Sequence, residues 1–83
     1  MEELLELIVS NIVKDEKFEI EKEETDKDIR FKVTSTRIGV SRLVGRKGLV
    51  ADSIRNVIRA LKNVDKKIYI EFVNFDEKDA DNN

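Results

Sequence analysis

The apolar residues of this chain switch between helical and strand spacing, and the order of these segments constrains the fold more than any other feature. Over residues 3–13 the apolar side chains recur at helical spacing. Apolar and charged residues then alternate around Phe18 and Ile20 and again over residues 29–34, which is typical of strands with one solvated face. Residues 37–44 and 50–62 have helical patterns, and residues 68–73 alternate again. The predicted order is helix, strand, strand, helix, helix, strand.

This order predicts an α+β fold with a three-stranded mixed sheet covered on one face by the helices. A polar turn at residues 25–28 joins the first two strands as an antiparallel hairpin. Two helices separate the second strand from the third, so these two strands are expected to pair in parallel. With 83 residues there is room for one domain. We expect that domain to span residues 1–75, followed by a disordered acidic tail over residues 76–83.

The composition argues against several classes of protein. Cysteine and histidine are both absent, which removes thiolate metal sites, the commonest zinc ligand and the usual general base. No segment has the apolar length of a membrane span, and the start Met1-Glu2-Glu3 is acidic where a signal peptide is basic. We therefore expect a cytoplasmic protein with no metal, no cofactor and no membrane partner. A phosphate-cradling enzyme remains an alternative, although the spacing of a P-loop is missing.

Charge is strongly segregated along the chain although the net charge is only −2. Residues 37–67 hold nine basic and two acidic side chains, a balance of +7. Residues 1–36 have a balance of −5, and residues 68–83 a balance of −4. A local positive field of this kind attracts an anionic partner even on an acidic protein. A solvated helix face rich in Arg and Lys is the alternative interpretation.

The loop between the two central predicted helices, Gly45-Arg46-Lys47-Gly48, carries the clearest functional pattern. Glycines have no Cβ, so the turn can be tight and a sugar-phosphate chain can approach the backbone. Gly45 is expected to end one helix in a left-handed conformation. The helix that follows presents free N–H groups and a positive dipole end, which suit a phosphate. Arg46 and Lys47 add cationic donors between the glycines.

The segment around this loop resembles the type II KH domain, and in particular the small single-KH proteins of bacteria, the KhpA family. The resemblance rests on the run from Leu43 to Arg55, in which Gly45, Gly48, Ala51, Ile54 and Arg55 match the family signature at the correct spacing. Arg46 stands where that signature usually has Lys, so the charge is kept. The resemblance covers roughly residues 3–75 and implies a type II KH-like α-β-β-α-α-β fold.

The resemblance also implies an RNA-binding groove and a set of residues that form it. Four nucleotides would lie between the helix pair and the last strand, with the loop clamping their backbone. The residues expected to bind RNA are Gly45, Arg46, Lys47, Gly48, Arg42, Val44, Ala51, Ile54, Arg55, Lys66 and Lys67. For Val44, Ala51 and Ile54 ordinary core packing is an open alternative. Arg59 can be a solvated charge, and Tyr69 is interpreted as partial core rather than as a base-stacking residue.

The expected function is binding of single-stranded RNA, as an RNA chaperone or post-transcriptional regulator. Single-stranded DNA is an alternative ligand. By its resemblance the protein is also expected to form a homodimer, or a heterodimer with a second KH-containing protein. A dimerisation module with weak or vestigial nucleic-acid binding is therefore the alternative function. Replacing Gly45 and Gly48 by Asp, or reversing the charges of Arg46 and Lys47, is expected to abolish binding and leave the fold intact.

Overall fold

The computed structural model describes residues 2–61 and 65–77 and contains the six predicted elements in the predicted order. These are α1 (Glu2–Val13), β1 (Phe18–Glu24), β2 (Asp28–Ser35), α2 (Arg37–Val44), α3 (Leu49–Leu61) and β3 (Lys67–Asn74). A short 3₁₀ turn over Arg46–Gly48 connects α2 to α3. No helix in the described ranges combines the length and the apolar composition that crossing a bilayer requires.

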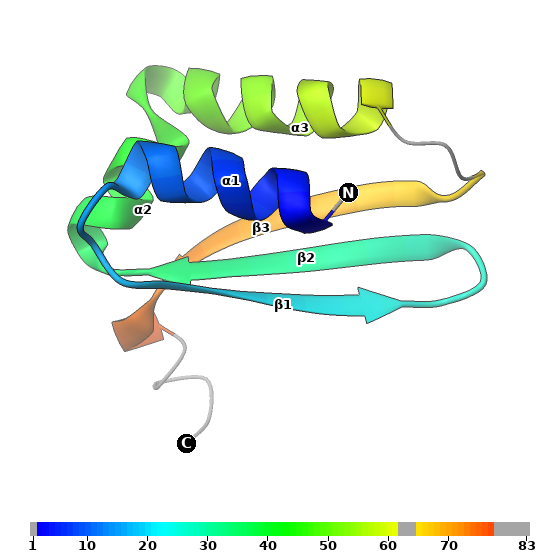
Figure 1. Cartoon of the computed structure of the whole chain (residues 1–83), viewed down its shortest axis with the longest axis horizontal. Helices are drawn as coiled ribbons and strands as arrows, with labels where there is room; N and C mark the ends of the chain where they lie inside the picture. The colour runs from blue at the N-terminus through cyan, green and yellow to red at the C-terminus, as the bar shows by residue number, and fades with distance from the viewer. Residues whose placement is uncertain (1, 62–64, 78–83) are drawn as a thin grey trace.

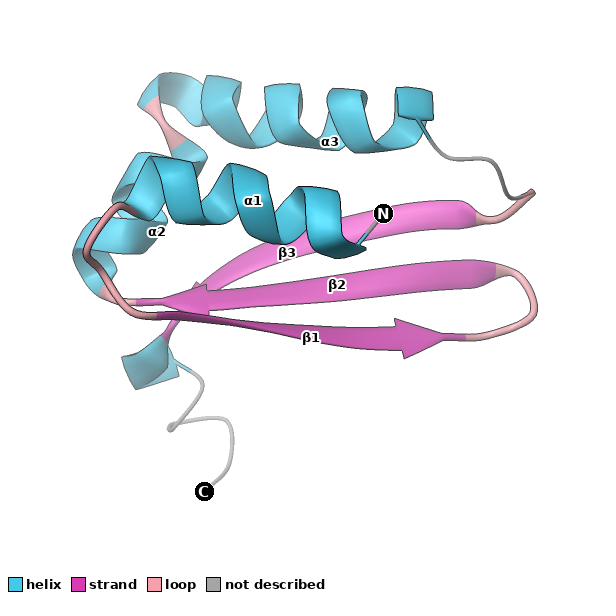
Figure 2. Ribbon diagram, viewed as in Figure 1, coloured by secondary structure: helices cyan, strands magenta, loops and turns pink. Residues whose placement is uncertain are grey.

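The sheet has the order β1-β2-β3, and the three helices lie together on one of its faces (Figure 1). β1 and β2 form the predicted antiparallel hairpin, whereas β2 and β3 pair in parallel. Figure 2 shows the resulting two layers, with α1 and α3 above the strands. The predicted mixed sheet and its one-sided cover are confirmed. β3 is an edge strand, so one side of its backbone has no strand partner among the described residues.

The core lies between the helices and the covered face of the sheet. Its largest fully buried apolar side chains come from all three helices and the central strand: Leu5, Phe31, Leu43 and Ile58. Along β2 every second residue from Ile29 is buried, as the alternation in sequence predicts. On α3 the buried residues Ala51, Ile54 and Ile58 follow helical spacing. Most of the opposite face of the sheet is open to solvent, but Thr34 near the end of β2 is buried there.

α2 begins where the sequence places it because Thr36 caps it. The Thr36 hydroxyl accepts a hydrogen bond from the Gly39 N–H at 3.0 Å and donates one to Glu16 Oε1 at 2.6 Å. Gly39 is buried against Ser35, so that the first turn of α2 packs directly on the end of β2. Any Cβ at this position would collide with the Ser35 side chain. The cap and the close contact together fix how the chain leaves the sheet.

The end of the described chain extends slightly past β3. Residues 75–77 form one helical turn, in which Asn74 Oδ1 accepts the Glu77 N–H at 2.7 Å. Asp76 also lies 3.4 Å from Arg37 in an exposed ion pair. Residues 78–83, most of the predicted acidic tail, lie outside the described residues, so that the tail stays a prediction.

Candidate nucleic-acid interface

The loop Gly45–Gly48 forms a tight turn that only glycine can make at its first position. Gly45 ends α2, and its N–H donates to the Ser41 carbonyl at 3.0 Å. Its backbone has φ +73° and ψ −179°, a region that is accessible essentially only to glycine. The expected left-handed conformation is therefore correct in the sign of φ but wrong in ψ. The Gly48 N–H donates to the Gly45 carbonyl at 3.3 Å and closes the turn.

The two glycines differ in the space around them. A Cβ on Gly45 would collide with Val50 Cγ2 and lie 2.8 Å from Val50 Cβ, whereas a Cβ on Gly48 would meet no atom within 4 Å. Gly48 resembles Gly45 only in its positive φ of +76° and lacks the steric contact. The steric contact therefore argues against the expectation that an Asp at Gly45 leaves the fold intact, because the new side chain would displace the side chain of Val50 in the first turn of α3. Charge reversal at the two middle residues avoids this problem.

Arg46 and Lys47 project from the turn into solvent. Both are exposed, and neither side chain forms a hydrogen bond or ion pair in the described part of the chain. Lys47 has φ 57° and ψ 23°, the left-handed conformation that non-glycine residues rarely adopt. Immediately after them α3 begins, with its positive dipole end, although the N–H groups of Gly48 and Leu49 already donate to the carbonyls of Gly45 and Arg46. Two cations and a helix N-terminus thus converge at a turn with little side-chain bulk.

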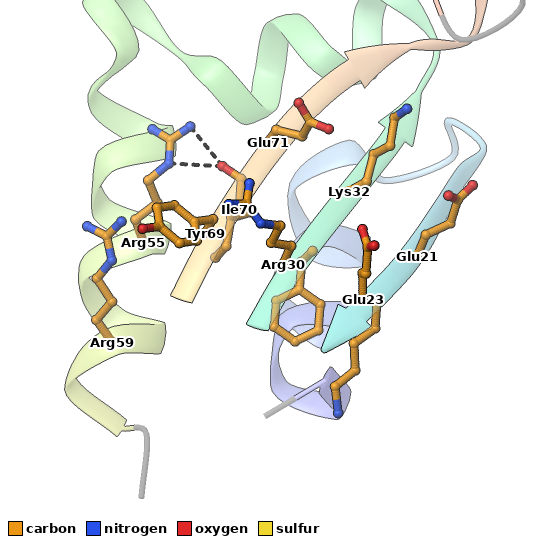
Figure 3. Close-up of a pocket in the computed structure, with 11 residues that line it drawn as sticks. Glu21, Glu23, Arg30, Lys32, Arg55, Arg59, Tyr69, Ile70 and Glu71 are labelled. Carbon is orange, nitrogen blue, oxygen red and sulfur yellow. Dashed lines mark hydrogen bonds between the residues drawn. The ribbon is translucent and has the colours of Figure 1, made fainter. Parts of the chain in front are cut away.

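Two arginines connect α3 to the free edge of β3. Arg55 Nε and Nη2 donate to the Ile70 carbonyl at 3.1 and 3.0 Å, as the dashed lines in Figure 3 show. Arg59 Nε and Nη2 donate to the Ile68 carbonyl at 3.3 and 3.2 Å. The spacings match: four residues of helix and two residues of strand each advance by about 6 Å. The unpaired edge of β3 is therefore capped by guanidinium groups, which also blocks addition of another strand.

Arg55 is held in this position by two further contacts. Its Nη1 donates to Asp52 Oδ1 at 3.2 Å, and its guanidinium carbon lies 5.6 Å from the centre of the Phe72 ring. The sequence predicted Arg55 as a residue that contacts RNA, and the structure places it on the wall between the loop and β3. Arg59, which the sequence left open as solvated charge, has the same structural role. The i, i+4 spacing of two arginines facing an edge strand was the signal that could have indicated it.

The remaining predicted site residues do not all converge on the loop. Val44, the last residue of α2, is half-buried beside it. Ala51 and Ile54 are only 3% and 4% exposed, so they support the wall from the core and offer a ligand almost no surface. Arg42 Nη1 donates to the Val13 carbonyl at 3.0 Å and thereby ties α2 to the end of α1.

Lys66 and Lys67 lie at the far end of β3 from the loop. Lys66 Nζ is 2.6 Å from Glu24 Oε2 and joins the start of β3 to the end of β1. This hydrogen bond from Lys66, together with a second from Lys22, lowers the pKa of the Glu24 carboxyl below its ordinary value of 4.5. Lys67 is exposed. Any ligand that touched both the loop and these lysines would have to run the full length of α3, about 20 Å.

The comparison with known families decides the classification. A sequence model of the KhpA/KhpB KH domain matches residues 2–72. The chain belongs to the KhpA/KhpB family of KH domains. The resemblance drawn from the glycine loop is confirmed, and so is the type II KH-like α+β fold with its three-stranded mixed sheet. The loop Gly45–Gly48 lies within the matched residues.

Curated relatives agree with the family assignment. Proteins named RNA-binding protein KhpA from Listeria monocytogenes serovar 1/2a and from Listeria innocua serovar 6a are each 37% identical to this KH domain over 76 residues. The matched region covers 88% of this chain and 99% of each relative. No solved structure matches the chain.

Proposed function

We propose that this KH domain binds single-stranded RNA, with the loop Gly45–Gly48 holding the sugar-phosphate backbone. The observation that carries the proposal is the pair of exposed cations, Arg46 and Lys47, set on a glycine turn at the N-terminus of α3. The names of the Listeria relatives support RNA as the ligand. The protein acts as a binding protein and not as an enzyme, in keeping with a family of KH domains. We place it in the cytoplasm, as an RNA chaperone or post-transcriptional regulator.

The loop contacts the sugar-phosphate backbone of the RNA, and the wall formed by α3 and β3 beside it determines the shape of the groove. A phosphate at the turn meets the positive dipole end of α3 and the side chains of Arg46 and Lys47. The path then follows the wall formed by α3 and β3, where Val44 offers apolar surface and Arg55 presents the face of its guanidinium. Ala51 and Ile54 fix the position of this wall from the core. Arg42, Lys66 and Lys67 lie at the margins, where they add to the positive field.

Single-stranded DNA fits the same backbone contacts because the loop recognises phosphate. Discrimination between RNA and DNA would need a hydrogen bond to the ribose 2′-hydroxyl. Competition between an RNA and a DNA of the same sequence measures this preference directly. We expect RNA to compete more effectively.

A second proposal concerns pairing with another KH domain. Three exposed apolar side chains of α3, Leu49, Val57 and Leu61, fall on one stripe with Ser53 at four-residue intervals. Leu49 is 62% exposed and Leu61 is 64% exposed, which is costly for a monomer. We propose that a second copy, or a second KH-containing protein, covers this stripe. Pairing would place two grooves on one RNA and raise the overall affinity through effective concentration.

The pairing proposal is tested by oligomeric state. Val57→Glu places a charge in the middle of the stripe, and Ser53→Glu places one between its apolar residues; both positions are exposed, so the fold should survive. Light scattering after size exclusion is expected to show a dimer for the parent protein and a monomer for Val57→Glu. A parent protein that is monomeric at all concentrations would refute the pairing proposal and leave the proposed RNA binding unaffected.

RNA binding is tested by reversing charge at the loop. Arg46→Glu plus Lys47→Glu should abolish the fluorescence-anisotropy response of a short labelled RNA. The matched control is Lys17→Glu plus Arg37→Glu, which makes the same change in net charge. Both control residues are exposed and lie where the chain enters β1 and α2, at the opposite end of α2 from the loop. Equal affinity of loop variant and parent protein would refute the proposal.

A further inference from the structure

The face of the sheet that points away from the helices carries one exposed aromatic ring. Tyr69 is 38% exposed and is not among the described side chains that pack against the hydrophobic core, so its interpretation as partial core is wrong. It lies opposite Arg30 in the β2-β3 register, and the Arg30 guanidinium carbon is 4.6 Å from the ring centre. This cation–π contact covers one side of the ring and holds its orientation. Among the described residues, Tyr69 is the aromatic side chain with the largest exposure.

The ring stands in a hollow that joins the solvated sheet face to the capped edge of β3. The hollow has a volume of about 860 Å³ and is lined by Tyr69 and Arg30 from the sheet and by Arg55 and Arg59 from α3. Figure 3 shows the two α3 arginines on one side of Tyr69 and Arg30 on the other. The hollow therefore connects the arginines of α3 with the open face of the sheet.

The charge of the hollow is uneven. Five basic side chains and three glutamates line it. Two of those glutamates, Glu21 and Glu23, lie on β1. The three arginines, Arg30 of β2 and Arg55 and Arg59 of α3, lie around the Tyr69 ring. Glu71 is the acidic residue nearest in sequence to Tyr69, and it lies opposite Lys32 in the register. The three arginines therefore favour an anionic chain beside the Tyr69 ring.

We propose that RNA extending beyond the four nucleotides of the groove crosses the edge of β3 and stacks a base on Tyr69. The inference rests on the proposed RNA binding and deepens it. Arg59 and Arg30 would lie on either side of the stacked nucleotide and meet its phosphates. An aromatic ring supported by arginines is the arrangement with which proteins hold single-stranded nucleic acid without reading its sequence. The occupant is therefore a nucleotide of any base, 3′ or 5′ of the groove.

RNA length separates this subsite from the groove. A labelled tetranucleotide fills the groove alone, whereas an octanucleotide of mixed sequence also reaches Tyr69. Tyr69→Thr removes the ring and keeps a β-branched residue suited to a strand. We expect it to bind the tetranucleotide like the parent protein and the octanucleotide about tenfold more weakly. Tyr69→Phe keeps the ring and should restore the parent affinity for both RNAs.

The comparison is made between proteins on the same RNA. An octanucleotide can place its bases in a four-nucleotide groove in several registers, which raises its apparent affinity. This increase is the same for every variant, so it cancels when variants are compared on one RNA. Unchanged octanucleotide affinity in Tyr69→Thr, with melting curves that show an intact fold, overturns the subsite. Loss of tetranucleotide binding in a folded Tyr69→Thr also overturns it, because Tyr69 would then belong to the groove. Failure of Arg46→Glu plus Lys47→Glu to weaken the tetranucleotide instead refutes RNA binding by the loop.

Discussion

Replacing Gly45 by alanine is expected to destabilise the protein far more than the same change at Gly48. At Gly45 two costs add. An alanine there must hold φ +73° with an extended ψ, which costs about 1–3 kcal/mol for a residue with a Cβ. The new Cβ must also displace Val50, which packs against the core, and overpacking of this kind costs about 1–3 kcal/mol. We expect a total loss of about 2–6 kcal/mol.

Gly48→Ala is the matched control, because Gly48 has the same sign of φ without the steric contact. Its Cβ would enter open space, so only the backbone cost of about 1–2 kcal/mol remains. A domain of this size has a free energy of unfolding of roughly 4–12 kcal/mol. The difference between the variants is therefore a substantial part of the total stability.

Thermal and urea denaturation followed by circular dichroism measure both variants. Each kcal/mol lowers the Tm of a domain of this size by about 4–8 °C. Gly45→Ala should thus melt at least about 8 °C below the parent protein and clearly below Gly48→Ala. Equal melting temperatures for the two variants would refute the claim that a Cβ at position 45 collides with Val50. Loss of RNA binding in any Gly45 variant must accordingly be corrected for unfolding.

Three further predictions concern the elements that support the site. Arg55→Leu keeps the apolar stem but loses the charged hydrogen bonds to the Ile70 carbonyl, so urea unfolding should show a loss of about 1–2 kcal/mol; an unchanged midpoint would contradict the edge cap. Thr36→Ala removes the cap of α2 and should cost about 1 kcal/mol in the same assay, whereas Thr36→Ser should restore most of it. Hydrogen bonding to Lys66 lowers the pKa of the Glu24 carboxyl in the folded protein. The stabilisation that this hydrogen bond gives the fold is therefore present at pH values above the ordinary pKa, and it is lost as the pH falls through the lowered pKa. An NMR titration should find that Lys66→Met moves the Glu24 pKa up towards 4.5, and a pKa that does not move would contradict the pairing.

Local patterns were sufficient to predict the elements and their order. Alternation along residues 29–34 and 68–73 identified strands, and the apolar stripe of α3 identified the longest described helix. The parallel pairing of β2 and β3 followed from the two helices between them. The bounds of α2 were predicted correctly because Thr36 is a good cap and Gly45 cannot continue a helix in this conformation. In these cases the determining interactions lie within a few residues of one another.

Contacts between distant segments could not be predicted in this way. The bond from Arg55 to the Ile70 carbonyl depends on how α3 lies across the edge of β3. The stacking of Arg30 on Tyr69 depends on the register of two strands separated by both α2 and α3. The collision that excludes a Cβ at Gly45 depends on the position of Val50 in the following helix. Sequence patterns therefore indicated which residues carry charge near the site, and the tertiary structure determined which of them stay free for a ligand.

The salt dependence of RNA binding tests the role of the loop most directly. Each phosphate neutralised on a single strand contributes a slope of about 0.7 to the fall of log K with log salt concentration. If Arg46 and Lys47 each contact one phosphate, Arg46→Gln plus Lys47→Gln should reduce the slope by about 1.4. The control Lys17→Gln plus Arg37→Gln should leave the slope unchanged. A loop variant with the parent slope would show that these cations do not hold the RNA backbone.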